Sequence, residues 1–301
     1  MNNFKKYLII TFITILPLSI LSFPMCSNAQ AASKNIMRIS PFILKLSLDP
    51  GQKSTHEISI QNLLDSPLPV RLTINDFDTK DEEGGFIISQ NSDKSIRSWL
   101  TLDKTDSILN KGESIKFELS IRVPKEISHG GYQTIVFIEP LSPGNSLGPS
   151  VSTKVGIPIF INIGNTEESQ AELADLDFPT ILLKNELNYF FRVKNNSPYH
   201  RSTKPILELK PLFGKSTTFF LDEKVIFPGK TRKWDGAINT NLKYPWPYRA
   251  KINISLGDGI QIHQTKTFLF LPILALFVIF FGIILARIVY KRMFIKREFN
   301  P

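Results

Sequence analysis

Cysteine is nearly absent from the sequence, which contains one such residue, Cys26, among its 301 positions. Cys26 lies in an N-terminal segment that we expect to be removed, so the mature chain is predicted to contain no cysteine. Proteins exposed to an oxidising eukaryotic secretory pathway usually carry disulfides. Their absence favours a bacterial surface, where core packing alone stabilises the folded chain.

Histidine is also scarce, and no two histidines have the His-x-x-x-His spacing of a local zinc site. No glycine-rich phosphate loop is present either. A Ser-His-Asp triad assembled from distant positions stays open, because its members need not be close in sequence. The residues nevertheless favour a protein that is not an enzyme and holds no metal or cofactor. The four histidines are His56, His129, His200 and His263.

One acidic cluster runs from Asp76 to Glu83 and is followed by Gly84 and Gly85. An EF-hand calcium loop needs a glycine at its sixth position. Counted from Asp76, the sixth residue is Asp81, so the pattern fails. The cluster is predicted to be a solvated hairpin loop.

Positive charge is in excess, with 36 Lys+Arg against 27 Asp+Glu and a formal net charge of +9. The excess is concentrated at the two ends, in Lys5 and Lys6 and in the basic segment 287–301. A nucleic-acid-binding domain would instead carry its basic residues in a patch on the folded part. The charge therefore predicts no nucleic-acid partner.

The N-terminus has the three parts of a secretory signal peptide. Lys5 and Lys6 precede an apolar run over 7–23, and the small residues Ala29-Gln30-Ala31 follow it. We predict a signal peptide over 1–32, with cleavage after Ala31 or Ala32. The alternative is a retained membrane anchor, which the short apolar run makes less favourable.

The segment 268–286 contains no charged residue and, as a helix, would be about 28 Å long, close to the thickness of a bilayer core. Basic residues follow it at once in the tail 287–301. The positive-inside rule then places this tail in the cytoplasm and the preceding chain outside. The prediction is a single-pass plasma-membrane protein; a buried core helix is the alternative.

Between these ends, apolar residues alternate with polar ones and the alternation breaks at Gly, Pro and Asn. Short strands that follow one another about every eight to twelve residues, with turn residues between them, are typical of β-sandwiches. We predict an all-β fold of two tandem immunoglobulin-like β-sandwiches, over 33–165 and 166–267, followed by one transmembrane helix. The predicted strands span 39–48, 55–62, 70–77, 86–89, 100–102, 114–123, 132–139 and 151–163, then 171–178, 188–194, 205–211, 216–221, 231–238, 248–255 and 260–266.

The segments ISPFILKLSLDPGQKSTHEISIQNLLDSPLPVRLTINDFD and VPKEISHGGYQTIVFIEP resemble the first domain of WxL-interacting proteins of bacterial cell surfaces. YFFRVKNNSPYHRSTKPILELK, FPGKTRKWDG and YPWPYRAKINISLGDG are similar to the second domain of that family. The order of signal, two sandwiches, span and basic tail also matches. The resemblance implies a peptidoglycan-binding domain, a second binding domain and an adaptor function without catalysis.

Tyr244, Trp246 and Tyr248 lie in a proline-stiffened segment and form the candidate binding site. Prolines hold such a segment extended, so exposed rings would bind sugars or a protein at low entropic cost. The alternative is that the three rings close the end of the second sandwich or contact lipid headgroups.

These observations predict a membrane-anchored adaptor that binds cell-wall peptidoglycan or a surface protein. The alternative function is an extracytoplasmic chaperone-like protein that binds a client by β-strand augmentation.

Overall fold

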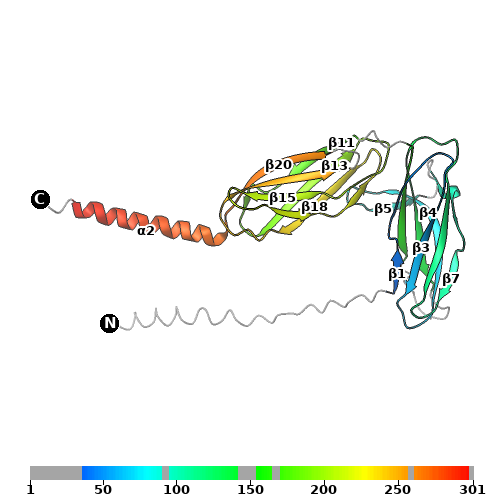
Figure 1. Cartoon of the computed structure of the whole chain (residues 1–301). Coiled ribbons are helices and arrows are strands. Elements are labelled where there is room, and N and C mark those ends of the chain that lie inside the picture. Colours follow the sequence, from blue (N-terminus) through cyan, green and yellow to red (C-terminus); the bar gives the residue numbers. More distant parts are fainter. Residues whose placement is uncertain (1–35, 90–94, 142–153, 165–169, 257–260, 298–301) are drawn as a thin grey trace. The chain divides into compact units, whose positions relative to one another are not determined.

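The computed structural model describes residues 36–89, 95–141, 154–164, 170–256 and 261–297. The predicted signal peptide over 1–32, with Ala31 and Ala32, lies outside these ranges, as does the predicted boundary at 165. The chain from Met37 onward forms one compact unit. Strands dominate it and one apolar helix follows them, which confirms the all-β prediction at this level (Figure 1).

The first sheet group, residues 37–163, consists of two sheets around one hydrophobic core. One sheet has the strand order β1-β3-β8-β6, and the other has the order β2-β10-β9-β4, with β5 and β7 both pairing with β4. The strands are β1 (Met37–Ser40), β2 (Leu44–Leu48), β3 (Lys53–Asn62), β4 (Leu68–Thr79), β5 (Phe86–Ser89), β6 (Leu100–Leu102), β7 (Asp106–Leu109), β8 (Ser114–Arg122), β9 (Gly130–Pro140) and β10 (Val155–Ile163).

The single strand predicted over 39–48 is wrong, because the structure divides it between the two sheets. β1 pairs antiparallel with β3, whereas β2 pairs parallel with β10. Pro41 separates them, and a proline has no N–H with which to continue a strand ladder. The chain therefore changes sheets at this residue and closes one edge of each.

The second sheet group, residues 171–270, has the sheets β11-β13-β18 and β12-β20-β19-β15-β16 and a short pair, β14-β17. Phe191 and Trp234 stack in its core with their ring centroids 5.3 Å apart. The strands are β11 (Ala171–Asp177), β12 (Ile181–Leu182), β13 (Glu186–Asn195), β14 (Arg201–Thr203), β15 (Ile206–Pro211), β16 (Thr217–Phe220), β17 (Lys224–Ile226), β18 (Thr231–Asn239), β19 (Pro247–Ser255) and β20 (Gln261–Phe270).

The two groups share the same arrangement of hydrogen bonds around a buried asparagine at the end of a central strand. Asn62 ends β3 and Asn195 ends β13, and both side chains are completely buried. In each case the side-chain amide donates to the backbone carbonyl of the residue four positions later in the sequence. It also donates to two consecutive backbone carbonyls of a turn far away in the sequence. The side-chain oxygen Oδ1 accepts the backbone N–H of the residue two positions later. The same asparagine thus fixes the same turn in both groups.

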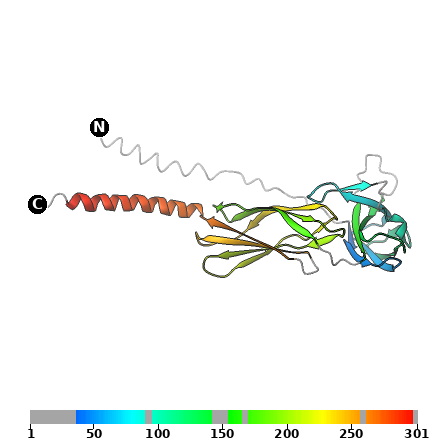
Figure 2. The same ribbon diagram turned by 90° about the horizontal axis from the view of Figure 1, so that it is seen from above.

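The helix α2 (Ile273–Arg297) follows β20 after two residues, as the red helix in Figures 1 and 2 shows. It begins later than the predicted start at Phe268, because β20 continues to Phe270 and pairs with β12 and β19. The candidate span over Ile273–Lys291 has no part buried within the protein. The uncharged run of the sequence is therefore shared between a strand and the helix.

Candidate binding site

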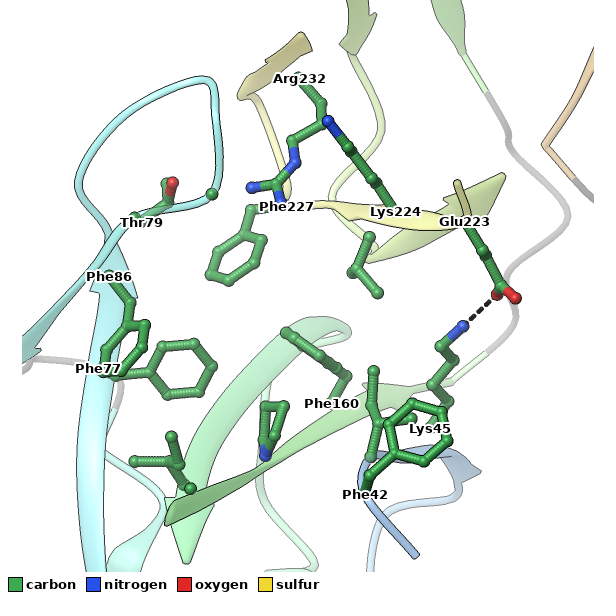
Figure 3. Close-up of a pocket in the computed structure, with 17 residues that line it drawn as sticks. Phe42, Lys45, Phe77, Thr79, Phe86, Phe160, Glu223, Lys224, Phe227 and Arg232 are labelled. Atoms are coloured by element: carbon green, nitrogen blue, oxygen red, sulfur yellow. Dashed lines mark hydrogen bonds and ion pairs between the residues drawn. The ribbon is translucent and has the colours of Figure 1, made fainter. Parts of the chain in front are cut away.

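A pocket of about 570 Å³ lies between the second sheet of the first group and the β17–β18 region (Figure 3). Most of its lining is apolar, and its charged residues come from β2, from β18 and from the segment 223–224. The lining comprises Phe42, Ile43, Lys45, Phe77, Thr79, Gly84, Gly85, Phe86, Ile135, Gly156, Pro158, Phe160, Glu223, Lys224, Val225, Phe227 and Arg232.

One wall of the pocket is an open strand edge. β9 pairs with β10 along all of Val155–Ile163, whereas β2 pairs only with Ile159–Ile163. Within the described residues, the first half of β10, Val155 to Pro158, therefore has a partner strand on one side only. Phe42, which is 79% exposed, precedes β2 at the point where this second partner is missing.

The floor of the pocket is aromatic. Phe77, Phe160 and Phe227 meet edge to face, with ring centroids 5.4–6.0 Å apart. His200 packs on the same cluster, with its ring 5.0 Å from that of Phe160. Edge-to-face pairs favour a fixed mutual orientation, so these rings form a well-packed apolar surface.

Two cations, Lys224 and Arg232, line the pocket from the second sheet group (Figure 3). Burial lowers the pKa of Arg232, and the charge of Asp81 opposes this effect. Burial also lowers the pKa of Lys224, and the nearby Arg232 lowers it further. The Nε of Arg232 is buried without a hydrogen-bond partner among the described residues, while Lys224 Nζ donates to the Lys233 carbonyl at 2.8 Å. The pocket therefore concentrates positive charge in an apolar setting.

The acidic hairpin between β4 and β5 adjoins the same pocket. Asp81 Oδ1 accepts the N–H groups of Glu83, Gly84 and Gly85 at 2.8–3.0 Å, and these bonds, that of Gly85 foremost, lower the pKa of Asp81. Gly84 has φ +104°, and a Cβ there would meet the Arg232 guanidinium at 1.8 Å. The positive φ favours glycine at this position, and a larger residue would also displace the Arg232 guanidinium.

Two carboxylates of this hairpin form ion pairs with the second sheet group. Glu82 Oε1 lies 3.4 Å from Arg192 Nη1, and Glu83 Oε1 lies 2.7 Å from Lys233 Nζ. The predicted solvated loop is thus a contact loop, and its acidic residues bind arginine and lysine of the other group.

A third ion pair joins Lys45 to Glu223 at the pocket rim and yields a pH prediction (Figure 3). The hydrogen bond from Lys45, and then the one from Ser202, lowers the pKa of Glu223. Because the folded chain favours the ionised form, the pair stabilises the fold at neutral pH, and this contribution disappears as the pH falls through that lowered pKa. Both side chains are partly exposed, so we expect less than about 1 kcal/mol.

Thermal unfolding of the wild type and of Glu223→Gln, measured from pH 7 down to pH 3 in detergent, tests this expectation. The wild type should be the more stable at pH 7, and the two curves should converge at the acidic end. A constant difference across the range would contradict it.

The structure does not bring the three predicted site residues into one exposed surface. Tyr244 and Trp246 are exposed, but Tyr248 is only 4% exposed and stacks on Phe268 in the core. Tyr248 pairs with Phe268 across β19 and β20, so its side chain points inward. Trp246 instead contacts Phe213, with ring centroids 5.9 Å apart.

Among the described residues, no group of three or more His, Cys, Asp or Glu is placed to hold a metal ion. One Gly-x-Ser-x-Gly sequence, 144–148, matches the pattern of a nucleophile elbow and lies outside the described ranges. The expected lack of catalysis therefore stays a prediction.

Sequence reasoning missed the pocket, although β10 carried a signal for it. Ile157, Ile159 and Ile161 belong to the core of the first group. Phe160, on the opposite face of the same strand, is also buried. A strand that is apolar on both faces is covered on both faces, and the run from Val155 to Ile163 indicates such a second cover.

No family model and no curated protein matches the chain. Several solved structures are similar to it. The class 5 fimbriae chaperone CfaA is 16% identical, with 79% of this chain and 100% of that chain covered and a TM-score of 0.39. The YadV chaperone is 14% identical, with 77% and 100% covered and a TM-score of 0.40. The CsuC–CsuE chaperone–tip adhesion subunit complex of Acinetobacter baumannii is 11% identical, with 78% and 98% covered and a TM-score of 0.39.

The predicted role as a cell-wall adaptor is corrected here: the three structures named above are described as chaperones, and nothing in the comparisons supports peptidoglycan as a ligand. At these identities the likeness concerns the immunoglobulin-like fold alone. The resemblance to WxL-interacting proteins is not tested by any of these comparisons and stays a prediction.

Proposed function

We propose that this protein is a membrane-anchored, extracytoplasmic chaperone-like protein that binds an extended segment of a partner protein along the open edge of β10. The observation that carries the proposal is the half-paired strand Val155 to Pro158 beside an apolar pocket. An exposed strand edge offers unpaired backbone groups to any chain that approaches it in extended form.

The direction of the free backbone groups supports this mode of binding. Pro158 has no N–H, and a proline within a sheet is tolerated where its position faces away from the partner strand. Backbone groups of successive residues alternate between the two sides of a strand. Gly156, two residues earlier, therefore directs its N–H and carbonyl to the open side, where a bound strand would accept and donate hydrogen bonds.

The pocket supplies the second part of the recognition. A strand added beside β10 presents alternate side chains to each face. On the outer face they meet Phe42, Phe86 and the phenylalanine floor, which favours apolar side chains. Lys224 and Arg232 favour an acidic group next to them. The proposed ligand is thus an extended segment with alternating apolar residues and one carboxylate.

The architecture that we propose is two tandem immunoglobulin-like domains with α2 as the membrane anchor. The identical turns held by Asn62 and Asn195 support a repeated domain. The unburied apolar helix supports the anchor, and the basic residues from Arg287 onward support a cytoplasmic C-terminus.

A synthetic peptide tests the binding mode. The probe alternates valine and isoleucine with threonine, carries one aspartate and a fluorophore, and has a control version that is N-methylated on alternate amides. We expect saturable binding of the probe to the full chain in detergent and none of the methylated version, since methylation removes the edge hydrogen bonds. Hydrogen exchange should show the amide of Gly156 open in the free chain and protected in the complex.

Substitution of Phe42 locates the site on the protein. Phe42→Asp should weaken peptide binding about tenfold, because it removes an exposed apolar anchor, and should leave stability nearly unchanged. Ile108→Asp is the matched control, since Ile108 on β7 is 64% exposed and lies outside the pocket lining. Equal effects of the two variants, equal binding of both peptides, or a Gly156 amide already protected in the free chain would overturn the proposal.

A further inference from the structure

The end of the second sheet group that leads into α2 carries a cluster of exposed apolar side chains. Leu212, Phe213, Tyr244 and Trp246 are all exposed, and Phe213 is 71% exposed. They come from two loops, 211–214 and 244–247, that are joined by a hydrogen bond from Leu212 N to the Pro247 carbonyl at 3.2 Å. Their exposure cannot be explained by core packing.

The 244–247 loop and β12 are hydrogen-bonded directly to the residues that lead into the helix, and the 211–214 loop is connected to them through its bond to Pro247. Phe270 N donates to the Trp246 carbonyl at 3.1 Å, and Leu271 N donates to the Leu182 carbonyl at 2.8 Å. Ile273, the first residue of α2, follows two residues after Leu271. Because consecutive Cα atoms are about 3.8 Å apart, the bonded backbones of Trp246 and Leu182 lie within about 15 Å of the start of α2, whatever direction the helix takes.

The uncharged part of α2 is shorter than a bilayer core, so this end of the second sheet group must lie close to the bilayer. Its uncharged part, 273–286, is about 21 Å long, whereas a hydrocarbon core is about 30 Å thick. The long side chain of Arg287 reaches toward the headgroups and so makes up part of this difference in length. The helix is still too short to span the core, so the residues just before Ile273, together with the loops bonded to them, lie at the headgroup level.

The three segments that form this end of the group carry charge of one sign. The segments 179–185, 210–216 and 241–249 contain no acidic residue. Their cations are Lys184, Lys210, Lys215, Lys243 and Arg249, and all five are exposed. Aromatic rings at headgroup depth, surrounded by lysines, are typical of a surface that rests on anionic lipid.

We propose that this end of the second sheet group is a bilayer-docking surface, which seats Leu212, Phe213, Tyr244 and Trp246 in an anionic lipid interface. The inference rests on the proposed anchoring by α2. It assigns to Tyr244 and Trp246 a lipid partner, separate from the pocket beside β10. Docking would hold the second sheet group against the membrane while the first group remains free to bind its ligand.

Spin labels measure the depth of this surface. Cys26→Ser gives a background without cysteine, into which Phe213→Cys or, as the control, Ile108→Cys is introduced. Each labelled full-length chain is reconstituted in vesicles of phosphatidylcholine and phosphatidylglycerol, and collision with oxygen is compared with collision with a water-soluble nickel complex. The label at 213 should favour oxygen and the label at 108 should favour nickel.

The headgroup charge is tested in the same system. Vesicles of phosphatidylcholine alone, or the added substitutions Lys210→Glu and Lys215→Glu, should shift the label at 213 several-fold toward nickel. A chain that does not float with the vesicles would refute the anchor itself. A chain that floats but keeps the label at 213 as open to nickel as the label at 108 would overturn the docking surface alone. Immobilisation of the label that grows with protein concentration would assign the surface to a second copy and would also overturn it.

Discussion

Asn62→Ala is expected to destabilise the protein by about 3 kcal/mol, more than a typical single substitution. The side-chain amide of Asn62 donates to the carbonyls of Ser66, Leu109 and Asn110 at 2.8–3.1 Å, and its Oδ1 accepts the N–H of Leu64 at 2.8 Å. Alanine removes the partner of these backbone groups, and the bond to the Leu109 carbonyl lies in a buried site. Unsatisfied buried groups cost more than the hydrogen bonds themselves contribute.

Asn195→Ala should have a similar effect in the second sheet group, where the same bonds reach Tyr199, Ile226 and Phe227. Asn196→Ala is the matched control, since the adjacent asparagine is exposed and should change stability by less than about 0.5 kcal/mol. Asn62→Asp should be worse than Asn62→Ala at neutral pH, because a carboxylate facing carbonyl groups has no proton to donate.

Urea unfolding in detergent, followed by near-ultraviolet circular dichroism, measures these differences. The double variant Asn62→Ala/Asn195→Ala should lose the sum of the two single effects, since the residues share no partner. Losses no larger than that of Asn196→Ala would show that water replaces the amide and that the turns do not depend on it.

Arg232→Glu is expected to weaken binding of the aspartate-bearing peptide about a hundredfold. The substitution removes an attraction and adds a repulsion inside an apolar pocket, where water screens charge poorly. Lys230→Glu changes the net charge equally at an exposed position outside the pocket lining and should alter affinity only slightly. Fluorescence anisotropy at several salt concentrations distinguishes the two, since the long-range effect at Lys230 is screened by salt.

Arg232→Gln should separate stability from binding. It removes a half-buried charge whose Nε has no hydrogen-bond partner among the described residues, so stability should rise by about 1 kcal/mol while peptide binding falls. A loss of stability would mean that attraction to Asp81 outweighs the cost of burial. Unchanged binding in both Arg232 variants would remove the carboxylate from the proposed ligand.

Period-two alternation determined most strands without help from the rest of the structure. In β8, Ile115, Phe117, Leu119 and Ile121 alternate with polar residues, and the strand forms where this pattern predicts it. The reason is local, because alternation leaves one apolar face that must be covered. The C-terminal helix was also determined locally, by a continuous uncharged run, since residues 273–286 offer no charged face.

Where residues could belong to more than one element, the sequence alone did not decide. The segment 268–286 has no charged residue and is predicted as one helix, but Leu269 and Phe270 extend β20 because they pair with β12 and β19. These partner strands lie far away in sequence, so no local pattern indicates the pairing. The division at Pro41 depends likewise on β3 and β10, which offer two different edges.

The position and the lining of the pocket beside β10 were decided by tertiary structure, although the apolar run of β10 indicated that both faces of this strand are covered. Its lining comes from segments between Phe42 and Arg232 that no local pattern connects. Tyr244 and Tyr248 show the same limit, since both belong to one aromatic-proline segment, yet one is exposed and the other is in the core. Periodicity records which side chains share a face of a strand, whereas the partner that covers a face, and so makes it core or site, is set by strand pairings across the whole chain.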